Sequence, residues 1–174
     1  MDLRIRTSVF SSFTNDYAII NLLVVCSPTC LSSAKAAFSW FVPAAFRNEG
    51  GITMTNDSLA RQAFDLVNQL RRQNGLAALQ WSDGLKAASD VRAAEAGTRF
   101  SHTRPNGQDW YTVDPALVYG ENLGNNFDDA RQIVKCWMDS PTHKQNILDP
   151  NFKTCSISVE NVHGTNFWAQ LFGC

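Results

Sequence analysis

The order of apolar and polar residues predicts an amphipathic helix over residues 58–74. Apolar residues recur there at spacings of three and four, which places them on one face of a helix. Asp57 or Ser58 can cap the start of this helix, and Gly75 follows its end. The face that we expect to be buried consists of Leu59, Ala63, Leu66, Val67 and Leu70.

Two later stretches have the same helical period. Over residues 82–96, the residues that share one face are Leu85, Ala88, Val91 and Glu95. A third helix is predicted over residues 127–140, where Asp128 and Asp129 favour the positive N-terminal end and Pro141 ends the helix. The residues of this third helix that we expect to face the core are Ile133, Val134 and Trp137.

The period changes near the C-terminus, which predicts a β-hairpin. Residues 155–159 alternate between apolar and polar, residues 167–172 form the second strand, and residues 161–166 form the turn between them. Residues 98–108 are rich in turn-forming residues and are predicted to be a loop.

This hairpin predicts a disulfide. A turn centred between residues 164 and 165 would place Cys155 opposite Cys174, and opposed residues in an antiparallel pair lie within disulfide reach. The alternative is two half-buried thiols in a reducing compartment. A further cysteine, Cys136, stands beside Trp137 on a helix and is predicted to be a small buried apolar residue.

The composition is that of one globular domain. The chain has 174 residues, 44% of them hydrophobic and 18% charged, which provides enough apolar material for a single core. The formal net charge is -1, and no clustered basic face is visible. We therefore expect no nucleic-acid partner. We also expect the protein to be a monomer.

Residues 1–53 are predicted to be a signal-like or disordered extension that precedes a domain at residues 54–174. Basic residues near the start, an apolar run at residues 18–26 and small residues after it are typical of a secretory signal, which predicts an extracellular protein. The run is too short to span a bilayer, so we expect no stable span in the mature protein. Two alternatives stay open: a poorly formed membrane anchor, and a misassigned start with Met54 as the true first residue.

Three segments carry a family resemblance. Residues 100–107 read F-S-H-T-R-P-N-G, residues 120–123 read G-E-N-L, and residues 137–148 read W-M-D-S-P-T-H-K-Q-N-I-L. In this order they resemble the CAP superfamily, which groups cysteine-rich secretory proteins, antigen 5 allergens and pathogenesis-related plant proteins. The resemblance is to the bacterial-type, SCP-like extracellular subgroup, and it covers about residues 57–174.

The resemblance implies an α+β fold, namely a three-layer α-β-α sandwich with a small, mostly antiparallel sheet. It also implies a cleft lined by His102, Glu121 and His143, which in several family members holds a divalent metal. Two imidazoles and a carboxylate suit zinc and would leave a position open for water. The chain departs from the animal and plant members, because it lacks their G-H-Y-T-Q-V segment and has Ser140 where their second acidic cleft residue would fall.

Four further residues are expected to support this cleft. Glu95 and Arg104 suit a structural ion pair beside the His102 loop, and Asn122 and Asn146 resemble amides that fasten loops.

The leading hypothesis is a secreted binding module for a divalent metal, a small apolar ligand such as a sterol or lipid, or an extracellular partner, as family members have been linked to defence and to sterol binding. The first alternative is a metal-dependent hydrolase of peptides or cell-envelope material. The second is a structural or effector module in which His102, Glu121 and His143 form an inert hydrogen-bonded network. No nucleophile motif surrounds Ser101 or Ser140, which argues against a serine hydrolase. We expect that the protein is not an enzyme, because an inert network and a non-catalytic ligand site both account for the three residues.

Overall fold

The structure is a computed structural model that describes residues 55–174. The predictions for residues 1–53, namely a signal, an anchor or a misassigned start, lie outside the described residues. Within residues 55–174, none of the helices combines the length and apolarity needed to cross a bilayer. The elements in chain order are α1 (Asn56–Gln73), β1 (Gln80–Trp81), α2 (Asp83–Thr98), the short 3₁₀ helix η3 (Trp110–Val113), β2 (Gly120–Asn125), α3 (Ala130–Asp139), α4 (Pro141–Ile147), β3 (Thr154–Val162) and β4 (Thr165–Gly173).

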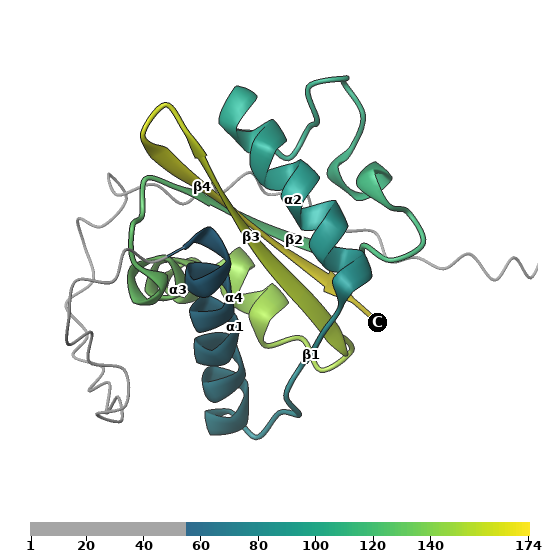
Figure 1. Ribbon diagram of the computed structural model, residues 1–174. Helices are drawn as coiled ribbons and strands as arrows, with labels where there is room; N and C mark the ends of the chain where they lie inside the picture. Colours follow the sequence, from purple (N-terminus) through teal and green to yellow (C-terminus); the bar gives the residue numbers. More distant parts are fainter. Residues whose placement is uncertain (1–54) are drawn as a thin grey trace, which may run out of the picture.

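In the described part of the chain, four strands form one sheet in the order β1-β3-β4-β2. The strands β1 and β3 run parallel, whereas β3 with β4 and β2 with β4 are antiparallel. The helix α2 covers one face of the sheet, and α1, α3 and α4 cover the other (Figure 1). The predicted three-layer α-β-α sandwich with a mostly antiparallel sheet is therefore confirmed.

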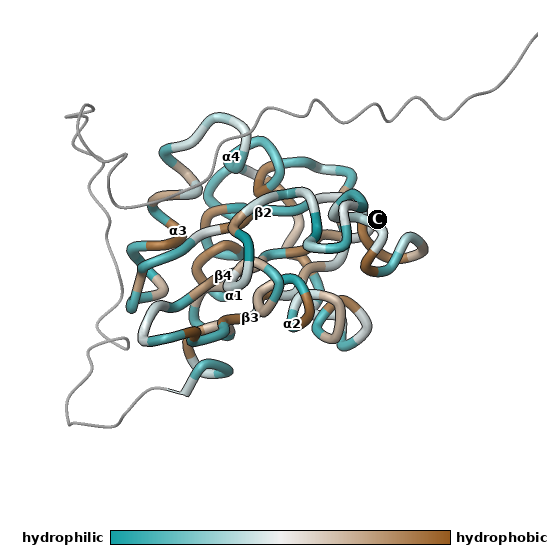
Figure 2. Tube along the Cα trace, turned by 90° about the horizontal axis from the view of Figure 1, so that it is seen from above, coloured by the Kyte–Doolittle hydropathy of each residue, from teal (hydrophilic) through white to brown (hydrophobic). Residues whose placement is uncertain are grey.

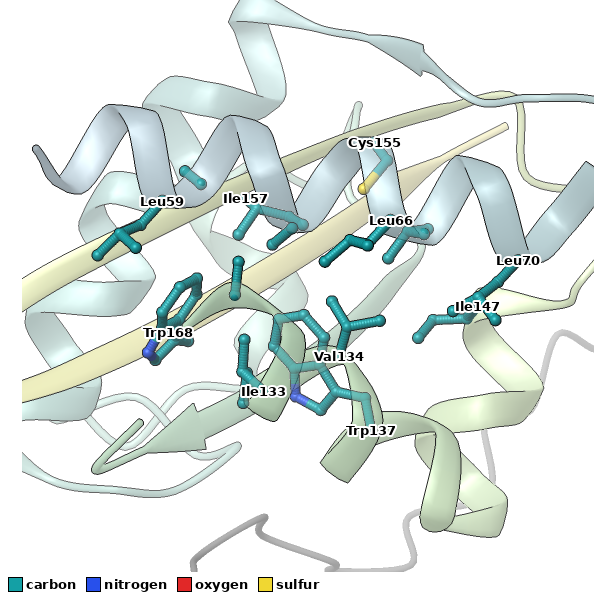
Figure 3. Close-up of a cluster of buried hydrophobic side chains, with 14 of the residues drawn as sticks. Leu59, Leu66, Leu70, Ile133, Val134, Trp137, Ile147, Cys155, Ile157 and Trp168 are labelled. Atoms are coloured by element: carbon teal, nitrogen blue, oxygen red, sulfur yellow. The ribbon is translucent and has the colours of Figure 1, made fainter. Parts of the chain in front are cut away.

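The main core fills the space between the sheet and the layer of α1, α3 and α4 (Figure 3). The predicted apolar faces of α1 and α3 are both buried, so both predictions are confirmed. Trp137 is fully buried, and its indole N–H donates to the carbonyl oxygen of Leu123 at 3.1 Å, which satisfies the polar atom of this large side chain. Side chains from three helices and two strands meet there, among them Leu59, Leu66, Leu70, Ile133, Val134, Ile147, Ile157 and Trp168.

The buried face of α2 is rotated from the predicted one. Val91, which its spacing places on the buried face, is 43% exposed, whereas Ser89 and Arg92 are buried. The sheet beneath offers polar partners: the hydroxyl oxygen of Ser89 lies 2.7 Å from that of Ser158 on β3. Because α2 buries polar side chains, the spacing of its apolar residues is a poor guide to its orientation. Figure 2 shows polar and apolar residues alternating along the helices.

Capping side chains set the ends of the helices. Thr55, rather than Asp57 or Ser58, caps α1, because its hydroxyl oxygen accepts a hydrogen bond from the Ser58 N–H at 3.2 Å. Asp129 caps α3 as its residue type predicts. Pro141 ends α3 and also occupies the first position of α4, a site that suits proline. The helix α4 was not predicted from the sequence.

The hairpin of β3 and β4 differs from its predicted register. His163 and Gly164 both have positive φ angles, 52° and 84°, as a two-residue type I′ turn requires. The turn is therefore centred one residue earlier than predicted. Cys155 consequently lies opposite Phe172 instead of Cys174.

This register overturns the predicted Cys155–Cys174 disulfide. Both cysteines are free, with Cys155 buried and Cys174 exposed. Burial raises the pKa of the Cys155 thiol to about 12, although a hydrogen bond from Gln170 and the charge of Arg71 act in the opposite direction. Because the thiolate is the reactive form, Cys155 is an inert core side chain. Cys136 is buried, as predicted, but it is disulfide-bonded and not simply a small apolar side chain of the core.

Gly124 marks a close approach between β2 and α3. A Cβ atom at this position would overlap the terminal methyl of Ile133 and touch the indole of Trp137. We expect Gly124→Ala to lower the free energy of unfolding by about 1–3 kcal/mol, because overpacking a tight core forces side chains off their rotamers. Urea denaturation of the purified protein measures this loss.

The variant Ile133→Val is the matched control for that prediction, because valine lacks the methyl that obstructs the new Cβ. The double variant should lose less than the sum of the two single losses. Simple additivity would contradict a steric origin at Ile133.

Candidate functional site

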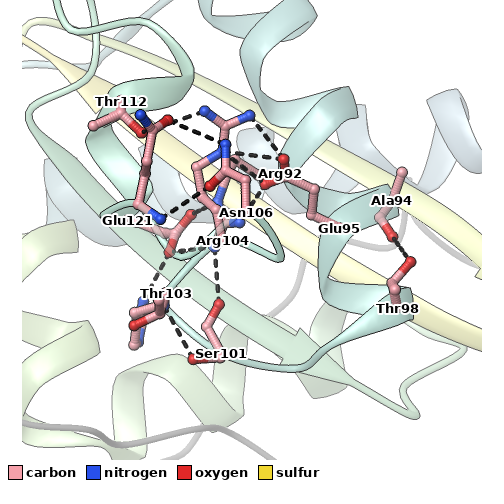
Figure 4. A network of polar contacts seen from close by, with 12 residues as sticks. Arg92, Ala94, Glu95, Thr98, Ser101, Thr103, Arg104, Asn106, Thr112 and Glu121 are labelled. Atoms are coloured by element: carbon pink, nitrogen blue, oxygen red, sulfur yellow. Dashed lines mark hydrogen bonds and ion pairs between the residues drawn. The ribbon is translucent and has the colours of Figure 1, made fainter.

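A buried ion pair joins α2 to β2 beneath the loop of residues 98–108 (Figure 4). The guanidinium of Arg92 donates from Nε to Oε2 of Glu121 at 2.6 Å and from Nη2 to Oε1 at 3.1 Å. The Arg92 side chain is 0% exposed and that of Glu121 is 1% exposed. A bidentate pair of this kind fixes both planes and uses both carboxylate oxygens.

Glu95 extends the pair into a chain of alternating charges. Nη1 of Arg92 donates to Oε2 of Glu95 at 2.6 Å, and the guanidinium of Arg104 donates to the same carboxylate at 2.7 Å and 3.0 Å. The predicted Glu95–Arg104 ion pair is thus present. Arg92 also donates from Nη2 to the carbonyl oxygen of Ser101 at 2.9 Å, so the network holds the start of the loop against α2.

His102 joins the network from the loop side. Its Nδ1 lies 2.8 Å from Oε1 of Glu121, and its side chain is 15% exposed. Because Nδ1 is engaged by the carboxylate, Nε2 is the ring nitrogen available to a ligand. A carboxylate that orients an imidazole in this way is the usual partner of a metal-binding or proton-transferring histidine.

His143 lies on the other side of β2. Successive residues of a strand point to opposite faces, so Glu121 points towards α2, while Asn122 points towards α4. The amide nitrogen of Asn122 donates to the carbonyl oxygen of His143 at 3.2 Å, and that of Asn146 donates to the carbonyl oxygen of Glu121 at 3.1 Å. Asn122 and Asn146 therefore join α4 to β2, whereas the sequence suggested that both amides fasten loops.

The three predicted ligands do not form a metal-binding cluster. In the part of the chain that the structure describes, no three His, Cys, Asp or Glu side chains come together in a way that could hold a metal ion. Glu121 also fits poorly as a zinc ligand, because both of its oxygens are used by Arg92 and the guanidinium charge repels a cation. The donor set of His102, Glu121 and His143 thus does not fit a resident zinc ion.

Arg92 is the residue of this site that sequence reasoning missed. A signal was available, because Arg92 precedes Glu95 by three residues on a predicted helix, a spacing that suits an ion pair. Its pairing with Glu121, 29 residues away, has no such local signal. Burial acts to lower the pKa of Arg92, but hydrogen bonds and charge from Glu121 and Glu95 outweigh burial and raise it. The guanidinium therefore stays charged.

Glu95 makes the stability of the network depend on pH. Burial acts to raise the pKa of Glu95, but hydrogen bonds from Arg104 and Arg92 outweigh burial and lower it below its ordinary value. A carboxyl whose pKa is lower in the folded state adds stability above its unfolded pKa of about 4.3, and this stability is lost as the pH falls through the folded value. Glu95→Gln should therefore destabilise the protein at neutral pH and by less at about pH 3.

Urea denaturation of the native protein and of Glu95→Gln, between neutral pH and about pH 3, measures this convergence. Asp65→Asn on α1 provides the control, because Asp65 is exposed and its substitution should change stability little. The prediction would be contradicted if the free energies of unfolding of the native protein and Glu95→Gln differed by the same amount at every pH.

Comparison with known proteins identifies the class to which this fold and network belong. The sequence model of the cysteine-rich secretory protein family, CAP, matches residues 64–172, which is more than half of the chain. The chain therefore belongs to the CAP family. A curated relative, the uncharacterized protein YkwD of Bacillus subtilis (strain 168), is 27% identical over 119 residues that make up 64% of this chain and 46% of YkwD. The chain thus spans less than half the length of that relative.

Solved structures of three bacterial proteins share the fold of this chain. A cysteine-rich secretory protein of Staphylococcus aureus subsp. aureus Mu50 matches 68% of this chain and 39% of its own, with a TM-score of 0.57 and 18% identity. An outer surface protein of Borrelia burgdorferi matches 65% of this chain and 90% of its own, with a TM-score of 0.58 and 19% identity. An extracellular protein containing an SCP domain from Bacillus anthracis str. Ames matches 70% of this chain and 44% of its own, with a TM-score of 0.59 and 23% identity.

Proposed function

We propose that this protein is an extracellular, non-catalytic binding domain that presents residues 101–119 as a rigid recognition surface. The observation that carries the proposal is that every carboxylate oxygen of the charged network already accepts a hydrogen bond from within the network. Both oxygens of Glu121 are used by Arg92 and His102, and both oxygens of Glu95 are used by Arg92 and Arg104. Carboxylates that are committed to neighbouring donors hold a loop in place, and they are poorly suited to remove a proton or to bind a metal.

An extracellular location is supported by the names of the structural relatives, one an extracellular protein and another an outer surface protein. The signal-like pattern of residues 1–53 supports the same location. Western blots of culture medium and cell lysate test it. Confinement of the protein to the cytosol would reject the extracellular part of the proposal.

A small apolar ligand at His102 fits the same proposal. Nε2 of His102 can donate a hydrogen bond to, or accept one from, the polar end of such a ligand, while Glu121 keeps the ring in one orientation. Labelled cholesterol and labelled fatty acid are the probes, and His102→Ala should abolish any uptake. His163→Asn is the matched control, because His163 is an exposed histidine at the hairpin turn and asparagine tolerates its positive φ angle.

A metal-dependent hydrolase is the second candidate, favoured by the carboxylate that orients His102. The full chain, with and without added zinc, is incubated with fluorescent casein and with labelled cell-wall fragments, and its zinc content is measured by mass spectrometry. We expect no turnover and no more zinc in the native protein than in the His102→Ala/His143→Ala variant. Zinc-dependent turnover that His102→Ala removes would overturn the non-catalytic proposal.

A further inference from the structure

The segment of residues 109–119 exposes large apolar side chains. Tyr111, Leu117 and Tyr119 are 41%, 39% and 46% exposed. Burying any of these large side chains would lower the free energy of the folded protein. The same segment contains Asp109, which is exposed, and Asp114, which is partly exposed. We name these five residues the tyrosine–aspartate surface.

The backbone beneath this surface is firmly held. Trp110 and Val118 are buried and pack against α2, next to Leu85 and Ala88. The Val118 N–H donates to the carbonyl oxygen of Asp114 at 3.0 Å. The segment is therefore a preformed surface, which lowers the entropic penalty of binding a partner.

The position of the surface is also fixed at its C-terminal end. The Tyr119 N–H donates to the carbonyl oxygen of Phe172 on β4 at 2.8 Å. The side chain of Leu117 lies over Gly84 in the first turn of α2, where it would contact a Cβ atom placed at that glycine.

The surface is acidic. Residues 105–119 include no Lys, Arg or His. Arg104, which donates to Thr112 in the segment, is itself paired with Glu95. Within residues 55–174, neither Asp109 nor Asp114 takes part in any of the ion pairs.

We propose that the tyrosine–aspartate surface docks a basic, partly apolar segment of a partner protein. The carboxylates of Asp109 and Asp114 pair with Lys or Arg side chains, and the rings of Tyr111 and Tyr119 accept cation–π contacts and cover apolar side chains. Nucleic acids and anionic membranes are repelled by the same carboxylates. This inference rests on the proposed binding function and adds the chemistry of the partner.

The test uses the full chain and a fluorescein-labelled peptide of Arg-Leu-Gly repeats, with fluorescence anisotropy as the readout. We expect binding that weakens with added salt, and no binding of a peptide with Glu in place of Arg. Asp109→Asn/Asp114→Asn should weaken binding about two- to tenfold, because each exposed pair contributes modestly. Asn at position 114 keeps the oxygen that accepts from the Ala116 N–H, so the turn is preserved.

Two further variants separate a local effect from a general one. Tyr119→Ser should weaken binding about three- to tenfold, while Tyr119→Phe should retain it, because the ring makes the contact. Asp65→Asn, on α1 in the opposite layer, should bind like the native protein. Thermal melting confirms that each variant is folded.

The docking proposal would be overturned if Asp109→Asn/Asp114→Asn bound the basic peptide as tightly as the native protein does. Binding of the acidic peptide, or failure of the native protein to bind the basic peptide, would overturn it as well. Turnover in the hydrolase assays would instead reject the non-catalytic function and leave the peptide titration unchanged, so the two failures are distinguishable.

Discussion

Replacing Arg92 with methionine should lower the free energy of unfolding by about 3–5 kcal/mol. The change leaves the carboxylate of Glu121, which is 1% exposed between the sheet and α2, without its cation. It also removes the donor to the carbonyl oxygen of Ser101 and one of the two cations beside Glu95. Because a lone buried charge is much less stable than a paired one, the loss should exceed that of an ordinary surface substitution.

Two variants distinguish an unpaired charge from lost packing. Arg99→Met replaces an exposed arginine next to the C-terminus of the same helix and should change stability by less than about 0.5 kcal/mol. Arg92→Met/Glu121→Leu removes both charges and should recover most of the loss, since apolar replacements of buried pairs are often neutral. Urea denaturation and thermal melting measure all three. A double variant no more stable than Arg92→Met would show that packing, not charge, is responsible.

The apolar pattern predicts those parts of the fold that bury apolar faces. The helices α1 and α3 were predicted with the correct buried residues, because each packs a continuous apolar stripe into the main core. The buried face of α2 was predicted only in part: Leu85 and Ala88 are buried, but Val91 is exposed. The helix instead buries Ser89 and Arg92 against polar partners in the sheet. The short helix α4 escaped prediction because Pro141 was interpreted only as the end of α3.

Register depends on turn geometry that composition does not specify. The sequence correctly indicated a hairpin with a turn near His163 and Gly164, but several centres are compatible with that composition. A displacement of one residue at the turn moves the partner of Cys155 by two positions, from Cys174 to Phe172. The predicted disulfide depended on that single choice and was wrong for this reason.

Only part of the site could be predicted from the sequence. The pair of Glu95 and Arg104, nine residues apart, was predicted, whereas the two asparagines, expected to fasten loops, join α4 to β2. The pairing of Arg92 with Glu121 arises only when α2 is packed across β2, and no local pattern encodes that packing. The placement of His143 behind β2 likewise follows from strand alternation, which requires the strand itself to be known.

Arg71 should be the second position at which one substitution strongly destabilises the domain. Its side chain is 1% exposed at the end of α1, and its guanidinium donates to four backbone carbonyl oxygens. The partners are the carbonyl oxygens of Ala77, Ile147, Asp149 and Phe152, at 2.8–3.4 Å. Burial lowers the pKa of Arg71, and the negative charge of Asp149 offsets part of this effect. We expect Arg71→Met to lower the free energy of unfolding by about 2–4 kcal/mol.

The physical reason is that one side chain satisfies acceptors from three parts of the chain. Ile147 ends α4, so the guanidinium also lies at the negative end of that helix and stabilises its dipole. Methionine fills a similar volume but leaves those carbonyl oxygens without a donor, and a buried acceptor without a partner is destabilising. Lysine carries the charge but lacks the planar fork that reaches several acceptors, so Arg71→Lys should recover only part of the loss.

The neighbouring Arg72 is the matched control, because it is exposed in the same helical turn. Arg72→Met should change the free energy of unfolding by less than about 0.5 kcal/mol in urea denaturation. Hydrogen exchange adds a local measurement: Arg71→Met should speed exchange at the C-terminal end of α4 and in residues 149–153 more than at the centre of β4. Equal effects of Arg71→Met and Arg72→Met would show that the buried guanidinium does not hold these segments together.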